Sequence, residues 1–204
     1  MLFALTDFLV VIGCGLGIWR LWPHRRRGDA RMIRLGLAFI GLAALAGAAR
    51  FASGQVDEMA QLHSLASTFA GSAGMLLIAL GLAWKAFPMP MAPGVGRYLR
   101  IGIPVLVVGM MAWPGSDGIL ALLPKLALLL GVAASIALLV HRRSQTGLIW
   151  LFAWALLGFA SIAIGGSRDE TSFGIANWHI YHTLLALWAV LAGEAMRRVI
   201  ASRA

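Results

Sequence analysis

The sequence is poor in cysteine and in charge. Its single cysteine, Cys14, excludes an internal disulfide and a cysteine-based metal cluster. Only 12% of the residues are charged, about half the fraction found in a soluble domain. The 17 basic residues outnumber the 8 acidic ones, but they stand in short clusters between apolar runs. Because they form no basic surface with interleaved aromatics, we expect no nucleic acid among the partners.

Several motifs that define enzyme classes are also missing. The chain has no H-E-x-x-H metalloprotease motif, no P-loop and no dinucleotide-binding fingerprint. The last apolar run, 172–199, contains no lysine that could form the Schiff base of a retinal protein. These absences argue against a metalloprotease of that type, a P-loop protein, a dinucleotide-binding enzyme and a retinal protein.

Long hydrophobic runs are what the sequence does have, since 60% of its residues are hydrophobic. A helix needs about 20 apolar residues to cross a bilayer. Pro, Gly and charged residues divide the chain into seven runs of that kind. The sequence therefore predicts an all-α, polytopic membrane bundle that forms a single domain over 1–204. The seven transmembrane helices are expected at 2–22, 32–52, 59–86, 99–114, 118–141, 147–165 and 172–199.

The distribution of basic residues predicts the orientation. All 17 basic residues except Arg50, Lys125 and Arg168 follow spans one, three, five or seven. By the positive-inside rule, the N-terminus lies outside and the C-terminus is cytoplasmic. We expect a multi-pass protein of a bacterial inner (cytoplasmic) membrane, with membrane lipids as its partners. Gly13 and Gly17 favour close packing within one chain, and assembly into a homo- or hetero-oligomer stays open.

Five ionisable side chains lie inside the predicted spans: Asp7, His63, Lys125, His179 and His182. Counting about 20 residues back from the cytoplasmic end of each span places all five in the outer third of the bundle. Ionisable groups in a membrane are costly and usually functional. Their common depth is the strongest functional signal in the sequence.

The histidines suggest a metal site. His179 and His182 are three residues apart, so on a helix they share one face. Together with His63 they would supply three imidazoles and leave a fourth zinc position to water. Asp7 would act as a base or orient a ligand, and Ser67, on the face of His63, is the second candidate for a catalytic role.

Each of these residues also has a structural interpretation. Histidines beside Trp178 and Tyr181 fit an interfacial aromatic belt that needs no ligand. Asp7 can pair with Lys125 or Arg50 as a buried ion pair. The Ser67 hydroxyl can bond to the backbone of its own helix.

The stretch "WHIYHTLLA" at 178–186, with His63 and Ser67 on span three, resembles the alkaline ceramidase superfamily, which includes the progestin and adiponectin receptors. The start of the last helix, with Asn177 and His182, is also similar to small bacterial seven-span proteins. The first resemblance implies an intramembrane hydrolase that holds zinc with three histidines. The chain departs from that pattern because its last-helix histidines are three apart instead of four, and because Met59 stands where the family has a serine.

Three functions remain open. The first is a zinc-dependent intramembrane hydrolase of a lipid-like substrate, with the site on the outer side. The second is a b-type haem or quinone electron-transfer protein, in which His63 and His179 or His182 ligate the haem iron. The third is a non-catalytic transporter, sensor or accessory subunit, with Asp7 and Lys125 as a charged gate and the histidines as a pH switch.

Overall fold

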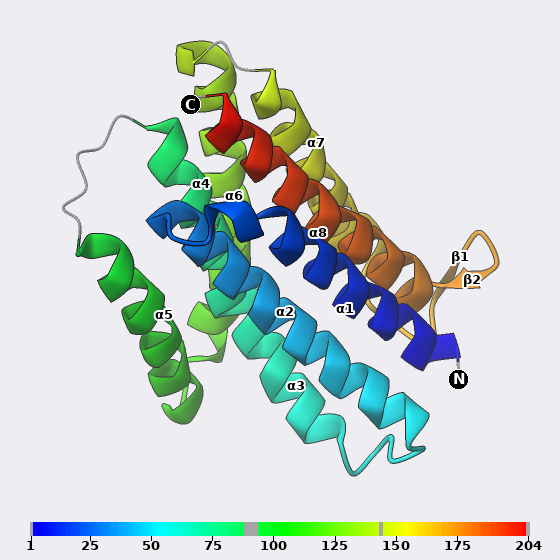
Figure 1. Ribbon diagram of the computed structural model, residues 1–204. Helices are drawn as coiled ribbons and strands as arrows, with labels where there is room; N and C mark the ends of the chain where they lie inside the picture. The colour runs from blue at the N-terminus through cyan, green and yellow to red at the C-terminus, as the bar shows by residue number, and fades with distance from the viewer. Residues whose placement is uncertain (1, 88–93, 143–144, 203–204) are drawn as a thin grey trace.

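The computed structural model describes residues 2–87, 94–142 and 145–202. In these residues the chain is almost entirely helical (Figure 1). In chain order the elements are α1 (Leu2–Arg20), the short 3₁₀ helix η1 (Trp22–His24), α2 (Gly28–Ala52), α3 (Ala60–Phe69), the π-helix η2 (Ala70–Gly74), α4 (Met75–Ala86), α5 (Val95–Ala112), α6 (Asp117–Arg142), α7 (Thr146–Phe159), the π-helix η3 (Ala160–Ile164), strands β1 (Thr171–Ser172) and β2 (Ile175–Ala176), and α8 (Asn177–Ala201).

Six helices in the described part of the chain are long and apolar enough to cross a membrane. They are α1, α2, the continuous helix from α3 through η2 to α4, α5, α6, and α7 with η3. The helical fold class and the multi-pass membrane character are therefore confirmed. The seventh long helix, α8, has 25 residues. It is not among these six, because polar residues at both of its ends lower its mean hydropathy.

The predicted start of the last span, at 172, is wrong. Residues 171–176 form a two-stranded antiparallel hairpin, and α8 begins only at Asn177. Phe173 and Gly174 have φ values of 56° and 77°, in the left-handed region, which a right-handed helix does not contain. Two other helices begin earlier than predicted. α2 begins at 28 instead of 32, and α5 begins at 95 instead of 99.

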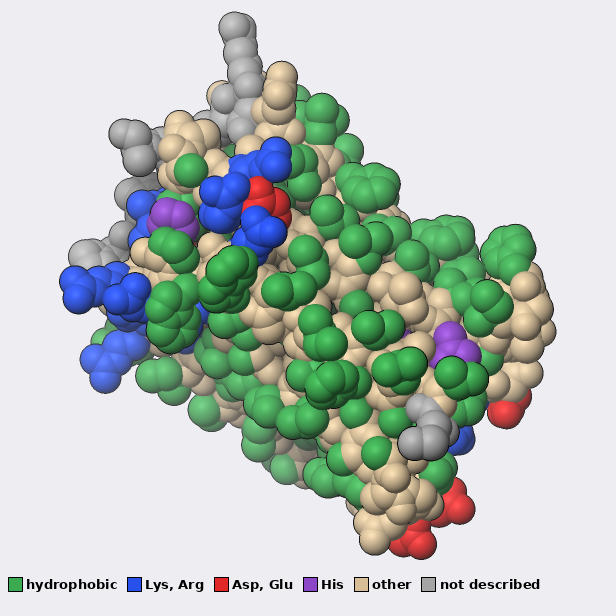
Figure 2. Space-filling model, turned by 45° about the vertical axis from the view of Figure 1, so that its right-hand side comes forward, with side chains coloured by type: hydrophobic (Ala, Val, Ile, Leu, Met, Phe, Trp, Pro, Cys, Tyr) green, Lys and Arg blue, Asp and Glu red, His purple; other side chains and the backbone are tan. Residues whose placement is uncertain are grey.

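Six of the long helices close into a ring. Around the ring each helix packs on the next in the order α1, α2, α4, α6, α7, α8, and α8 returns to α1. α5 stands at the edge of this ring (Figure 1), where Ile103 and Val107 pack against Met32 of α2 and Leu77 of α4. On the face shown in Figure 2, Lys and Arg side chains gather at one end of the bundle and most acidic side chains at the other.

Glycines bring α1 and α8 into close contact. A Cβ on Gly13 would stand 2.5 Å from the carbonyl oxygen of Ala186, and one on Gly17 would stand 2.6 Å from that of Ala189. The two sequence positions increase together, so α1 and α8 run parallel. Both helices therefore begin at the same end of the bundle, and the Gly-x-x-x-Gly spacing serves packing within one chain.

Candidate functional site

A buried Asp–His pair joins the second turns of α1 and α8. Asp7 is fully buried, and its Oδ1 lies 3.1 Å from Nε2 of His182. The other ring nitrogen of His182, Nδ1, lies 2.8 Å from the carbonyl oxygen of Trp178, one turn earlier in the same helix. Asp7 faces α8 because it shares the face of α1 that Gly13 and Gly17 occupy further along the helix.

These two contacts fix how many protons the pair holds. A carbonyl oxygen only accepts hydrogen bonds, so Nδ1 of His182 carries a hydrogen. If Nε2 carried none, its lone pair would face a carboxylate inside a low-dielectric interior, which is repulsive. We therefore expect the pair to hold one proton between Nε2 of His182 and Oδ1 of Asp7, either as carboxylic acid and imidazole or as carboxylate and imidazolium.

His63, on α3, lies on the other side of Asp7. A Cβ placed on Gly47 of α2 would stand 2.3 Å from Oδ2 of Asp7 and 2.8 Å from Cε1 of His63. The two side chains thus meet over a glycine that leaves them room. Nδ1 of His63 and both carboxyl oxygens of Asp7 are buried and have no partner with hydrogen-bond geometry in the described part of the chain, so Oδ1 of Asp7 is in ion-pair contact with His182.

The indole of Trp178 covers this group of side chains. Its ring stacks on the ring of His182 with 4.3 Å between centroids, and it lies 6.0 Å from the ring of His63. It is close enough to Asp7 to interact with the carboxylate, although its own N–H has no partner with hydrogen-bond geometry. We call Asp7, His63, Trp178 and His182 the Asp7 cluster.

His179 contacts two residues of α1 that precede Asp7. Its Nδ1 lies 3.2 Å from the hydroxyl of Thr6, and its ring stacks on Phe3 at 4.7 Å between centroids. It points toward the end of α1 and not into the Asp7 cluster. The shared face that the three-residue spacing predicts is therefore real, but the partner of both histidines is α1.

Residues at the end of α2 and at the start of α8 cover the Asp7 cluster. Arg50, buried at the end of α2, donates from Nε to the carbonyl of Val56 in the following loop. Its guanidinium lies 5.3 Å from the ring centre of Phe51, and that ring packs edge-on against Trp178 at 5.4 Å. The Asn177 amide donates to the carbonyl of Ile164 at 2.8 Å, so the segment before α8 is tied down as well.

Two of the predicted residues lie elsewhere. Lys125 is exposed on α6, which packs on α4 and α7 and not on α1, so it does not form a charged gate with Asp7. Ser67 is exposed on α3 and lines a cavity of about 330 Å³ between α3, η2 and α6, together with Ser72, Asp117 and Pro124. That cavity shares no lining residue with the Asp7 cluster.

No group of three or more His, Cys, Asp or Glu side chains is arranged to hold a metal ion in the described residues. The reason is visible at the two histidines of α8. His182 has both ring nitrogens engaged by Trp178 and Asp7, and His179 points its Nδ1 at Thr6. A zinc ion held by His63, His179 and His182 would require both α8 rings to leave these partners.

Sequence reasoning missed the role of two residues that shape the cluster. Gly47 makes the space for Asp7 and His63, but it is one of 24 glycines, and nothing in the spacing singles it out. Trp178 was interpreted as a belt residue, although its position four residues before His182 places it one turn away on the same face. That spacing was the signal for an indole stacked on the imidazole.

Comparison with known proteins finds no family model, curated protein or solved structure that matches the chain.

Proposed function

We propose that this chain is a proton-responsive integral membrane protein of the sensor or transporter class, with the Asp7–His182 pair as its proton-binding site. In this proposal α8 is the seventh span, the N-terminus lies outside and the pair faces the outer side. The observation that carries it is a fully buried carboxylate 3.1 Å from an imidazole whose other nitrogen already donates to a carbonyl.

The pair has the properties that a proton site needs. In this proposal it holds one proton that no other described group replaces, since neither carboxyl oxygen of Asp7 has a partner with hydrogen-bond geometry in the described residues. Loss of that proton leaves a negative charge buried between α1 and α8, and an uncompensated buried charge costs several kcal/mol. Arg50, whose charge acts on Asp7, is the cation placed to respond.

The helix contact can carry a local protonation event to the other end of the bundle. α1 and α8 are joined by Asp7 and His182 at one end, and by Arg20 and Glu194 at the other, where the N–O distance is 3.3 Å. The glycine contacts lie between these two polar contacts. When the proton leaves and the helices separate at Asp7, the tight glycine contacts act as a pivot, and the Arg20–Glu194 contact changes in turn.

The arrangement favours a sensor over a hydrolase. A hydrolase needs space for a substrate beside its catalytic groups, whereas the Asp7 cluster is covered by Trp178, the ring of Phe51 and the segment before α8. A sensor needs only that protonation change the contact between two packed helices.

A pH titration of tryptophan fluorescence tests the proposal on the purified full-length protein. The stacked Trp178 reports on His182, and the spectrum of Trp178→Phe identifies its contribution among the 8 tryptophans. We expect a one-proton transition in the wild type that Asp7→Asn removes. Asp117→Asn, at an exposed acid in the first turn of α6, is the matched control and should keep the transition.

Two results would contradict the proposal. One is a transition in Asp7→Asn that matches the wild type. The other is about one zinc ion per chain that is lost in His182→Ala, because tight metal binding displaces the proton from a histidine ligand. The second result would restore the hydrolase interpretation, and a Soret band in the absorption spectrum would restore the haem interpretation.

A further inference from the structure

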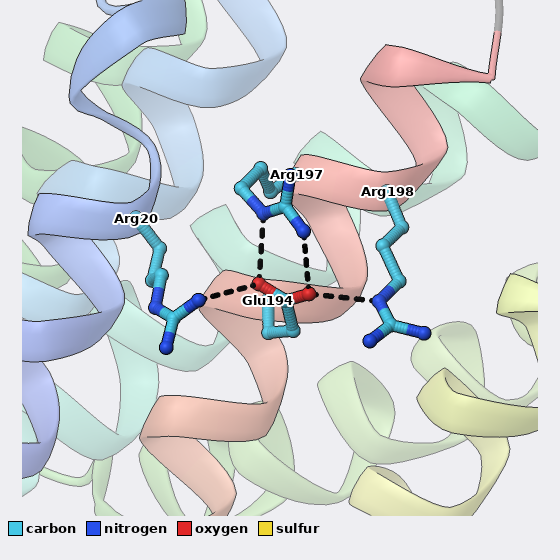
Figure 3. A network of polar contacts seen from close by, with 4 residues as sticks. All are labelled: Arg20, Glu194, Arg197 and Arg198. Atoms are coloured by element: carbon cyan, nitrogen blue, oxygen red, sulfur yellow. Dashed lines mark hydrogen bonds and ion pairs between the residues drawn. The ribbon is translucent and has the colours of Figure 1, made fainter.

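The basic end of the bundle carries two arginine clusters, and among the described residues only the first contains a carboxylate. In the first, Arg20, Arg197 and Arg198 surround the carboxylate of Glu194 (Figure 3). The N–O distances are 3.3 Å to Arg20 and 2.7 Å to each of the two arginines of α8. This cluster contains its own anion.

The second cluster has no anion of its own. It joins five arginines from the segment after η1, from α2 and from α5: Arg25, Arg31, Arg34, Arg97 and Arg100. The charge of Arg34 interacts unfavourably with those of Arg25 and Arg31, and that of Arg100 with those of Arg31 and Arg97. None of the five forms an ion pair with a carboxylate of the described residues.

In the described part of the chain, the hydrogen bonds that these arginines donate go to backbone carbonyls. Nε of Arg31 donates to the carbonyl of Arg25 at 2.9 Å, and Arg100 donates to that of Gly28 at 3.4 Å. The acid nearest in sequence, Asp29, is buried and is held by Nζ of Lys85 at 2.8 Å. Most of the guanidinium N–H groups therefore remain available to an external ligand.

Arg34 gives an independent indication of an anion-binding site. Its Nε is buried but has no hydrogen-bond partner in the described part of the chain. The guanidinium is also fixed in place, because it lies 4.6 Å from the ring centre of Trp22. A buried donor without an acceptor is energetically costly, and a bound anion would remove that cost.

We propose that these five arginines bind the phosphate group of an anionic phospholipid. Guanidinium groups match phosphate oxygens through paired N–H donors. The cluster lies where apolar helices end, beside the exposed rings of Trp22 and Tyr98, which are 52% and 74% exposed. Such aromatics mark the depth of lipid headgroups, and basic clusters next to membrane-spanning helices recognise anionic lipids.

Native mass spectrometry of the full-length protein tests this proposal, with phosphatidylglycerol as the probe and phosphatidylcholine as the zwitterionic comparison. We expect the wild type to retain phosphatidylglycerol selectively. Each arginine near an anionic lipid surface contributes roughly 1 kcal/mol, so Arg31→Gln/Arg34→Gln should bind phosphatidylglycerol about 30-fold more weakly. The double variant of α5, Arg97→Gln/Arg100→Gln, should weaken binding similarly and covers the case in which the first variant does not fold.

Arg197→Gln/Arg198→Gln is the matched control, since it removes the same charge at the same end but from the cluster that has Glu194 (Figure 3). It should bind phosphatidylglycerol as the wild type does. Equal losses in the control and in the two test variants would overturn the proposal, because a diffuse positive surface would then suffice. Displacement of the lipid by inorganic phosphate at comparable concentration would overturn it as well, because the ligand would then be a soluble anion.

Discussion

Gly47→Ala tests the geometry of the Asp7 cluster without changing any titratable group. The added Cβ would stand 2.3 Å from Oδ2 of Asp7 and 2.8 Å from Cε1 of His63. Ordinary contacts begin near 3.4 Å, so the carboxyl group would have to retreat by about 1 Å. Asp7 is short and fully buried, and such a movement separates it from His182.

The expected cost follows from the packing. Adding a methyl group to a filled interior costs about 1–3 kcal/mol, while exchanging glycine for alanine inside a helix returns about 0.5–1 kcal/mol. Gly15→Ala is the matched control, because a Cβ at Gly15 of α1 meets nothing within 4 Å. The two variants should therefore differ in their free energy of unfolding by about 1–3 kcal/mol, with Gly47→Ala the less stable.

Two measurements check this prediction. Thermal unfolding in detergent compares the stability of the two variants, and the fluorescence titration compares their proton transitions. We expect Gly47→Ala to shift or lose the transition and Gly15→Ala to keep it. If Gly47→Ala unfolds at the same temperature as Gly15→Ala and retains the wild-type proton transition, then Asp7 and His63 do not meet over Gly47 of α2.

Three further substitutions test the packing and the buried polar contacts. Gly193→Ala should lower the melting temperature, because a Cβ there would stand 2.4 Å from the backbone of Gly17 and overpacking costs about 1–3 kcal/mol; an unchanged melting temperature would mean that α1 and α8 are further apart. Lys85→Met should destabilise by up to about 3 kcal/mol in denaturant unfolding, since it removes the nearer cation of the buried Asp29 carboxylate, 2.8 Å away, and among the described residues leaves only Arg27 at 3.5 Å. Ser72→Ala should cost about 1 kcal/mol by the same assay, because it removes a buried hydrogen bond to a carbonyl of α6; no change there would show that the bond does not stabilise this contact.

The helices could be predicted because hydropathy and helix breakers act locally. A run of about 20 apolar residues between Pro, Gly and charge has few other structures available in lipid. The prediction failed at 172–176, where Phe173 adopts a left-handed conformation that is uncommon for a large side chain. The two π-helices, at 70–74 and 160–164, also went unpredicted, because a π-helix depends on how neighbouring helices pack.

The order of helices around the ring could not be predicted from hydropathy. That order decides whether Lys125 lies near Asp7. Depth alone places Lys125 with Asp7, His63 and the two α8 histidines. In the ring, α6 packs on α4 and α7, so Lys125 is exposed on a different side of the bundle. Residues at one depth share a site only when their helices are neighbours, and that information lies in small residues such as Gly13 and Gly17.

The His-x-x-His spacing shows how one correct local inference is compatible with different partners. Three residues apart on a helix, His179 and His182 do share a face, and both turn it toward α1. Because α1 runs parallel to α8, its side chains at successive turns meet those of α8 at the same depths. Phe3 and Thr6 therefore face His179, and Asp7 faces His182. Two histidines on one face are equally suited to one metal ion or to two partners on a parallel neighbour, and only the neighbour's sequence decides between them.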